Sequence, residues 1–570
     1  MHFNIATGAV TLTAVATTAM AMEMPKDTTR AAELYDSGKL HAWNMERKIE
    51  MTIAQAEAGM LNSTVWPRLN YTKCEDGVAQ AIPGDPLHGF KCKNIDLYDF
   101  INHATLGSPN GYGLTPDSIP RTGSSTWGWI DPESGREFIA NGMVDGTAFI
   151  EILPEGRMSL LGFLPVPVPI ERFALWKEVR SYKHYMLIGS EMVNHGVQIF
   201  DMTKLLDIDP EAPVKFDPVR DVTGHFTDLP GPGRSHNIVV YEEKDLLLVV
   251  GSQPRTDECR SGLILVDLSD ISNPTKIGCN PNDGYVHDAQ CLTYKGPDEK
   301  YLGRDVCYSY NEDTLTIYDV TDPANSSIIS VTSYEGATYT HQGWVLDPEW
   351  QEFLILDDEL DEVNSVGAAQ DGYPVTFIWQ LESLESPKQV GLYKGSVRSV
   401  DHNQYIKDGL TYQSNYQAGL RVYDISSIPT DPSGNSVCEV AYFDIHPEDD
   451  NEPGGGVPTY EFGTWAAYAM FPSGFIFINT KERGAFLVKM TRRESCPNVH
   501  PCNADNCLRA MRSTSVEGRL EESQEFCGAF LSGWSADVGE VPAYGATACG
   551  ENIISRVSSA CSCLPTPTSI

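Results

Sequence analysis

Four histidines stand at comparable places in a repeated pattern, and their side chains could act together. Each lies at the start of an apolar stretch with β-strand character, and successive members are about 50 to 60 residues apart. They are His236, His287, His341 and His402. Neutral imidazole is a common ligand of zinc, copper, iron and nickel, so a fold that gathered these rings could hold one divalent transition metal.

Two other interpretations fit the same four histidines. The rings could wall a polar pocket for a small molecule or a glycan, together with aromatic side chains. They could instead be structural, each bound to a neighbouring strand so that the spacing of the repeats is fixed. The metal interpretation requires the rings to converge within about 2 Å of one point, the length of a metal–nitrogen bond, whereas structural histidines tolerate rings that point apart.

Seven segments of the chain share one layout, and that layout predicts the fold class. Each contains strands of about four to eight residues, rich in Val, Ile, Leu and aromatic residues and separated by Gly, Pro and Asp. Four such strands per repeat predict an all-β fold, a seven-bladed β-propeller. The seventh segment lacks a fourth strand after Met490, and residues 90–101 could supply it and close the ring.

The first strand of a propeller blade lines the central channel, so the residues at the seven strand starts should form a ring. The second strand returns to the same face, so its end should lie beside that ring. We therefore expect a ligand pocket at one face of the channel. Besides the four histidines, its expected members are Trp127, Trp176, Trp465, Glu191, Asp288, Asn311, Asp358, Asp401 and Asn415, with Gln253, Glu359 and Thr480 also at ends of second strands.

Several of these segments resemble a known family. "WGWIDPESGREFIANGMVDGTAFIEI", "SHNIVV" and "VHDAQCLTY" look like the LVIVD-repeat proteins of the choice-of-anchor B family, and "LILVD", "LTIYD" and "LRVYD" stand in place of the LVIVD signature. The resemblance runs from about Cys92 to Met490 and implies a secreted or surface propeller. It implies no activity, because the family is largely uncharacterised. The cysteine-rich C-terminus separately resembles a tail of secreted fungal proteins.

The ends of the chain predict secretion and two appendages. Residues 1–21 end in Ala-Met-Ala and read as a signal peptide cleaved after Ala21. Residues 22–89 predict a helical N-terminal extension, with two helices broken near "DSGK", and residues 90–492 form the predicted propeller. A disulfide-rich module (493–563) and a flexible tail (564–570) follow. No further apolar run is long enough to span a membrane.

Secretion makes disulfides and glycans the expected modifications. Fourteen cysteines are present. The expected pairs are Cys74 with Cys92, Cys259 with Cys279 and Cys291 with Cys307, and Cys438 is left to bridge to the tail. Sequons place candidate glycans on Asn62, Asn70 and Asn325.

Charge excludes one class of partner. The formal net charge of -37 repels phosphate backbones, so nucleic acid is not an expected partner. The run "LDDELDEVN" (Leu356–Asn364) lacks the spacing and the glycine of an EF-hand. We expect it to form a solvated loop, with a loose calcium site as the alternative.

The sequence therefore predicts a secreted ligand-binding propeller whose channel face is lined by histidine, with a divalent transition metal as the candidate cofactor. No nucleophile elbow, zincin helix or phosphate-binding loop motif is present. If the protein is an enzyme, metal-dependent oxidation or hydrolysis is the expected chemistry. Expected partners are a small molecule, a glycan or an extracellular or cell-wall protein. The alternative is a non-catalytic adhesion or cell-wall interaction protein with structural histidines.

Overall fold

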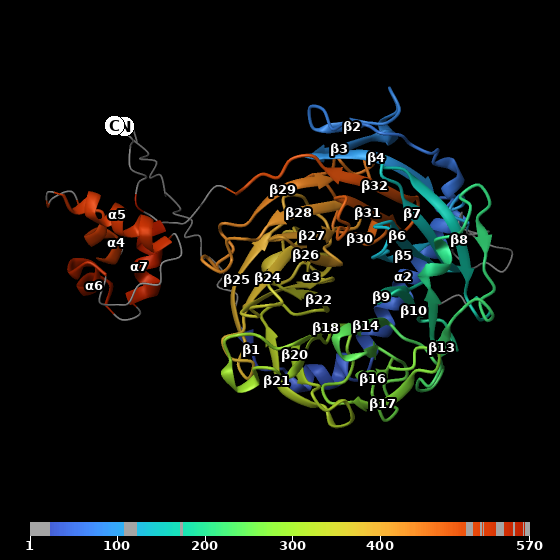
Figure 1. Cartoon of the computed structure of the whole chain (residues 1–570), viewed down its shortest axis with the longest axis horizontal. Coiled ribbons are helices and arrows are strands. Elements are labelled where there is room, and N and C mark those ends of the chain that lie inside the picture. Colours follow the sequence, from blue (N-terminus) through green and yellow to red (C-terminus); the bar gives the residue numbers. More distant parts are fainter. Residues whose placement is uncertain are drawn as a thin grey trace, which may run out of the picture.

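The computed structural model describes residues 23–107, 122–170, 175–496, 506–513, 516, 518–531, 541–550, 553–562 and 564. The predicted signal peptide and most of the flexible tail lie outside these residues. Seven sheets, each with an antiparallel core of four strands, stand around a common axis and form a seven-bladed β-propeller (Figure 1). The fold class predicted from the repeats is confirmed.

The strands of the first four blades follow one another along the chain. The first blade contains β5 (Gly123–Ile130), β6 (Glu137–Met143), β7 (Gly146–Ile152) and β8 (Met158–Pro165). The second contains β9 (Lys177–Tyr182), β10 (Tyr185–Ser190), β11 (Val197–Asp201) and β13 (Gly224–Phe226). The third contains β14 (Asn237–Tyr241), β15 (Leu246–Val250), β16 (Leu263–Asp267) and β17 (Thr275–Asn280). The fourth contains β18 (Asp288–Thr293), β19 (Asp305–Tyr310), β20 (Leu315–Asp319) and β21 (Ser327–Tyr334).

The fifth and sixth blades are also built from consecutive strands, and the seventh takes its fourth strand from far away in the chain. The fifth contains β22 (Thr340–Val345), β23 (Phe353–Asp358), β24 (Val375–Gln380) and β25 (Lys388–Lys394). The sixth contains β26 (Gln404–Lys407), β27 (Leu410–Ser414), β28 (Leu420–Asp424) and β29 (Cys438–Phe443). The seventh contains β30 (Thr464–Tyr468), β31 (Phe475–Thr480), β32 (Gly484–Met490) and β4 (Ile95–Asn102). Short strands add to the outer edges: β1 (Glu23–Met24), β12 (Val214–Lys215), β2 (Val78–Gln80) and β3 (Gly89–Lys93).

A recurring irregularity separates the third and fourth strands of the blades. The register shifts by one residue at Leu265/Val266 in the third blade, at Ile317/Tyr318 in the fourth and at Ile378/Trp379 in the fifth. A β-bulge increases the local twist and bends the strand. The bulge bends each outer strand toward the apolar residues that pack between blades. In the third blade these residues include β15, in which every residue is buried.

The ring is closed by a strand that precedes the first blade in the sequence. Strand β4 pairs antiparallel with β32, and Phe100 lies opposite Phe486. The prediction that residues 90–101 supply this strand is confirmed for its second half. Strand β3 instead pairs with β29 at the outer edge of the sixth blade, because Asn94 takes a positive φ of 56° and turns the chain between the two strands.

The N-terminal extension carries helices that reach the ring. Helix α1 (Thr28–Arg30) continues as a π-helical turn (Ala31–Tyr35) and is followed by α2 (Lys39–Glu57). The break falls within "DSGK", where Gly38 has φ +73°. One face of α2 is buried, including His41, Lys48 and Ile49. In Figure 1 the blue helix α2 passes behind the ring and is seen partly through its opening.

Helices also form the C-terminal module: α4 (Asn506–Met511), α5 (Arg519–Leu531), α6 (Ala543–Cys549) and α7 (Ile553–Ser562). The shorter helices of the ring are α3 (Asp361–Asn364) and the 3-10 turns Ser63–Val65, Pro86–His88, Met202–Leu205, Glu242–Lys244, Glu299–Tyr301, Pro323–Asn325 and Gly367–Ala369. Among the described residues, no helix has both the length and the apolar composition needed to cross a bilayer.

Six disulfides join described cysteines. Within or beside the ring they are Cys74–Cys92, Cys259–Cys279, Cys291–Cys307 and Cys438–Cys496. The C-terminal helices are joined by Cys507–Cys549 and Cys527–Cys561. Disulfides of this number are typical of proteins from an oxidising, extracellular compartment.

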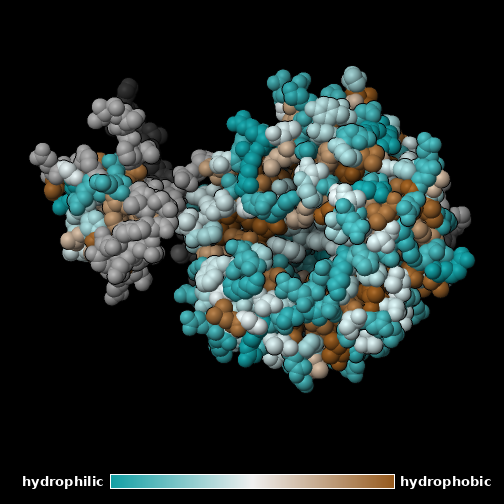
Figure 2. All heavy atoms as spheres, in the orientation of Figure 1, coloured by the Kyte–Doolittle hydropathy of each residue, from teal (hydrophilic) through white to brown (hydrophobic). Residues whose placement is uncertain are grey.

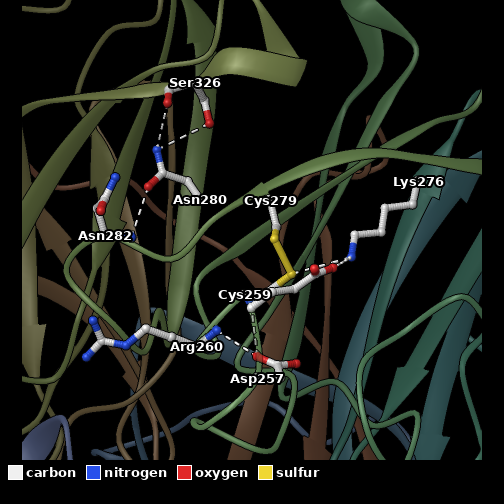
Figure 3. Close-up of a disulfide and its surroundings, with 9 residues drawn as sticks. Asp257, Cys259, Arg260, Lys276, Cys279, Asn280, Asn282 and Ser326 are labelled. Carbon is white, nitrogen blue, oxygen red and sulfur yellow. Dashed lines mark hydrogen bonds and ion pairs between the residues drawn. A yellow bond between two sulfur atoms is a disulfide. The ribbon is translucent and has the colours of Figure 1, made fainter.

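The disulfide of the third blade illustrates how these bridges are placed. Cys259 lies in the loop before β16 and Cys279 near the end of β17 (Figure 3). Lys276 donates to the neighbouring Glu258 at 3.0 Å and lies 3.5 Å from the Cys259 sulfur. Glu258 and the two sulfurs are close enough together for a metal site, but sulfur in a disulfide is not a thiolate ligand.

The visible face of the ring is predominantly hydrophilic, with separate apolar patches, as expected for the net charge of -37 (Figure 2). Two of the three candidate glycosylation sites, Asn70 and Asn325, are exposed, and Asn62 is half-buried. Asn62 also accepts a hydrogen bond from the backbone of Thr64 at 3.2 Å.

Candidate functional site

The four histidines meet at the axis of the ring. His236, His287 and His402 lie just before the first strands of blades three, four and six, and His341 lies inside β22. The centroids of consecutive rings are 4.3 Å apart for His236 and His287, 4.2 Å for His287 and His341, and 4.4 Å for His341 and His402. Four blades therefore contribute one continuous row of imidazoles.

Local backbone features aim these side chains into the channel. His341 is the extra residue of a β-bulge between Thr340 and Gln342, and a bulge re-aims the side chain that it carries. The end of β15 passes so close to His236 that a Cβ on Gly251 would lie 2.4 Å from the Cβ of the histidine. Gly251 also has φ +65°, so glycine is required there.

Backbone carbonyls fix the orientation of two rings. Nδ1 of His287 donates to the carbonyl oxygen of His341 at 2.8 Å, and Nδ1 of His402 donates to that of Trp465 at 2.7 Å. A carbonyl can only accept, so both histidines carry their proton on Nδ1. In the neutral ring this leaves the lone pair of Nε2 free to bind a metal.

Carboxylates orient the other two rings. Nδ1 of His236 lies 2.5 Å from Oε1 of Glu191, and Nδ1 of His341 lies 3.3 Å from Oδ1 of Asp357. All four Nδ1 atoms are thus held from outside the row by oxygen. This is the outer-shell arrangement that fixes the tautomer of metal-binding histidines.

Glu359 completes a group of three candidate ligands. Ligand atoms of His341, His402 and Glu359 all lie within 4.8 Å of one another. Oε1 of Glu359 also accepts hydrogen bonds from Lys48 at 2.6 Å and from the hydroxyl of Tyr416 at 2.5 Å. Burial alone would raise the pKa of Glu359, but Lys48 and His402 outweigh burial and lower it, so this carboxylate is ionised.

The other end of the row contains an unusual contact. Nε2 of His236 lies 2.7 Å from Nε2 of His287. Two nitrogen lone pairs at this distance repel each other, so one of the atoms must carry a proton that the other accepts. A cation between the two nitrogens would satisfy both lone pairs in the same way.

Burial keeps most of these imidazoles neutral. Burial, reinforced by neighbouring cationic groups, lowers the pKa of His287 and of His341 well below the ordinary value. Burial also lowers the pKa of His402 to about 4, against the opposite effect of Glu359. Neutral imidazole is the form that binds metals.

The row faces a small cavity of about 20 Å³. Its wall includes the four histidines, Glu359 and Lys48, and aromatic side chains close it: Tyr339, Trp176 and Trp465. A cavity of this size holds about one water molecule or one ion. Asn44 and Met45 of α2 form part of the same wall, so the N-terminal helix covers the site.

Only part of the pocket expected from the sequence lies at this cavity. Trp176 and Trp465 line it, and Glu191 contacts it through His236. Trp127 lies deeper in the channel, where its ring meets Tyr405 and Arg180 lies 4.5 Å above it. Strand β5 starts at Gly123, so Trp127 is further along its strand than the other ring members are.

The remaining expected members have other surroundings. Burial raises the pKa of Asp288 to about 7, against the effect of Arg180. Asn311 donates to Asp283 at 3.0 Å. Asp358 accepts from the backbone amides of Thr338 and Tyr339, Asp401 is buried beside other acids, and Asn415 closes the turn after β27.

The acidic run Leu356–Asn364, which begins in β23, does not form a solvated loop, and that prediction is wrong. Asp357, Asp358, Glu359, Asp361 and Glu362 are all buried. They are buried because α2 and the neighbouring blades cover the ends of the channel strands. Burial and the neighbouring carboxylates raise the pKa of Asp361 and of Glu362 well above the ordinary value.

The side chains that α2 brings to the site were not expected from the sequence. Lys48, Met45 and His41 all belong to α2, far from the repeats. The buried face of α2 is mostly polar and includes His41, Asn44, Lys48, Thr52 and Gln55. That pattern places the helix against something polar but does not identify the partner.

No family model matches the chain, and no curated protein matches it. Among solved structures, it is similar to the crystal structure of a protein from Lactobacillus plantarum, with 13% sequence identity and a TM-score of 0.37. That similarity covers 63% of this chain and 88% of the other. A likeness at this level carries no argument about function.

Proposed function

We propose that the protein is a secreted propeller that binds one divalent transition-metal ion at its axis. His341, His402 and Glu359 would be the first ligands, and Nε2 of His287 would be the next. The observation that carries this proposal is the orientation of the imidazoles: all four Nδ1 atoms are held by oxygen from outside the row, which leaves the Nε2 atoms to face the cavity.

The ligand set has a recognised chemical preference. Two imidazoles and one carboxylate hold iron(II) in oxygenases, and the same set holds zinc in hydrolases, with positions left open for water or substrate. Burial of His341, His402 and Glu359 supplies the low dielectric in which a bound metal activates water. Metal-dependent oxidation or hydrolysis is therefore the class of reaction that we propose.

The contact between His236 and His287 is explained by a shared proton, and its length also suits an ion held by both rings. Two ligands at right angles with bonds of about 2.0 Å have nitrogen atoms about 2.8 Å apart. The 2.7 Å between the two Nε2 atoms is close to this separation.

A second function has one specific observation in its favour. His287 and His402 each bind the backbone of the next blade, at His341 and at Trp465. These bonds hold neighbouring blades together without any metal. In this case the protein would be a non-catalytic adhesion protein of the LVIVD-repeat type that uses its outer surface.

Metal analysis of the secreted protein tests the two functions. We expect about one transition-metal ion per chain by plasma mass spectrometry for protein made without a histidine tag. His341→Gln should lose most of this metal and keep its circular dichroism spectrum. His88→Gln is the matched control, because His88 is a buried histidine outside the site. A metal-free wild type that cannot be loaded with iron, zinc or copper would reject the metal function.

A further inference from the structure

A larger cavity lies directly outside the histidine cavity. It has a volume of about 350 Å³ and is bounded by α2 and by the loops of blades two and three. This volume falls at the lower end of the range for pockets that bind small organic ligands. Its wall is largely apolar and includes Ala42, Met45, Ile49, Pro232 and Pro254.

The two cavities share one side chain and are linked by contacts of two others. Met45 lines both of them, so its side chain separates the outer pocket from the metal ligands. Glu191 lines the outer pocket and holds Nδ1 of His236. His41 also lines the pocket, and its ring centroid lies 6.0 Å from that of His236.

We propose that the outer pocket binds a small aromatic molecule and presents its donor atom to the axial metal past Met45. This inference rests on the proposed metal function and assigns the substrate class. The pocket binds the aromatic ring of the substrate. The donor group reaches the metal past the Met45 side chain, which separates the pocket from the metal ligands.

The lining argues for an aromatic molecule rather than a glycan. Methionine sulfur makes favourable contacts with aromatic rings, and proline and imidazole offer flat faces for stacking. A glycan would require many hydrogen-bonding groups, whereas the polar wall consists of a few side chains, chiefly Arg234, Gln253 and Glu191. Unbranched methionine can also change rotamer, which suits a partition that must open.

The position of each wall residue defines an inside and a mouth. His41, Ile49 and Glu191 are buried, and Met45 is half-buried. Ala42 and Glu46 are exposed at the outer end of the pocket. A large side chain at position 42 would therefore obstruct the mouth without entering the packed interior.

Two probes test the inference with the cobalt-loaded protein. Imidazole reports access to the metal alone, and 4-phenylimidazole adds a ring that must lie in the pocket. We expect 4-phenylimidazole to bind about tenfold to a hundredfold more tightly than imidazole, followed through the visible spectrum of cobalt. Ala42→Trp should remove this advantage and leave the affinity for imidazole within about twofold. Glu50→Trp, an exposed position on α2 that does not line the pocket, should behave as the wild type.

Calorimetry of the metal-free protein separates this inference from the metal function. If cobalt does not bind, but 4-phenylimidazole does and Ala42→Trp abolishes it, the metal function fails and the pocket remains an aromatic site. Equal affinity of the two probes in the metal-loaded protein would overturn the inference and leave the metal function intact. An unchanged 4-phenylimidazole affinity in Ala42→Trp would overturn it as well, as would no binding of the phenyl probe in either form.

Discussion

Nζ of Lys48 donates a hydrogen bond to Oε1 of Glu359 at 2.6 Å, although 311 residues separate them in the chain. Tyr416 donates to the same oxygen. The helix that covers the channel thus places a cation against the carboxylate that is grouped with His341 and His402. A metal ion bound at the proposed site would compete with Lys48 for the negative charge of Glu359.

Replacement of Lys48 tests this competition. Lys48→Met keeps the length of the side chain and removes the charge, so we expect the affinity for zinc to rise about tenfold to a hundredfold, because a nearby unit charge repels the ion by a few kcal/mol. A competition titration against a chromophoric chelator measures the change. Lys39→Met, on the same helix but exposed, should have no effect. Unchanged affinity in Lys48→Met would show that Glu359 does not contact the ion.

The closing strand should contribute strongly to stability. Phe100 of β4 is buried and packs against Phe486 with ring centroids 4.5 Å apart. We expect Phe100→Ala to lower the free energy of unfolding by about 3–5 kcal/mol, since it leaves a cavity between blades. Urea denaturation measures the loss, and Val219→Ala, at an exposed position, is the control. A loss below about 1 kcal/mol would contradict closure by this strand.

The disulfide between Cys438 and Cys496 should stabilise the junction of the last two blades. It closes a loop with a sequence separation of 58 residues, against 18 for Cys74–Cys92. In the chain-entropy treatment the longer loop contributes about 4 kcal/mol and the shorter about 3 kcal/mol. Replacing each pair by serine and comparing denaturation midpoints tests this order. The reverse order would show that strain or residual structure dominates.

A buried carboxyl group that does not line the histidine cavity should give a pH dependence. Burial raises the pKa of Asp313 to about 7, against Lys26 and together with Asp283, Glu312 and Asp36. In the unfolded chain its pKa is about 4, so between pH 4 and pH 7 the folded state holds a proton that the unfolded state has lost. Stability must therefore fall as the pH rises through this window, by about 4 kcal/mol at most.

The variant Asp313→Asn removes this proton and should flatten the stability curve between pH 4 and pH 7. Thermal unfolding at half-unit pH intervals measures it. Glu243→Gln replaces an exposed carboxylate and should keep the slope of the wild type. If Asp313→Asn keeps the pH slope of the wild type, the slope arises from other titratable groups.

The blades were predictable because their determinants are local and repeated. Strand length, apolar residues and turn residues recur seven times. Because His236, His287, His341 and His402 hold equivalent positions in four repeats, the propeller fold brings them together at one axis. Trp127 shows the limit of such alignment. Its residue type matches that of Trp465, but β5 begins well before Trp127. A shift along a strand moves a side chain to another level of the channel.

The packing of helix α2 over the histidine site was not predictable from the sequence. Nothing near Lys48 in the sequence indicates that its partner is Glu359, since the contact depends on how α2 lies across the assembled ring. The acidic run misled for the same reason. A run of adjacent acidic residues is typical of an exposed loop. Asp361 and Glu362 are buried because α2 and the neighbouring blades pack over this segment.

Strand β4 has a consequence for biosynthesis. Its partner β32 is made almost four hundred residues later, and α2 is made before any wall of the cavity that it covers. The ring cannot close until the chain has been synthesised through Met490, so the early segments must stay soluble and unpaired while the blades form. The histidine cavity is thus completed last, when α2, made first, and Trp465, made near the end, close around the histidines of the middle blades.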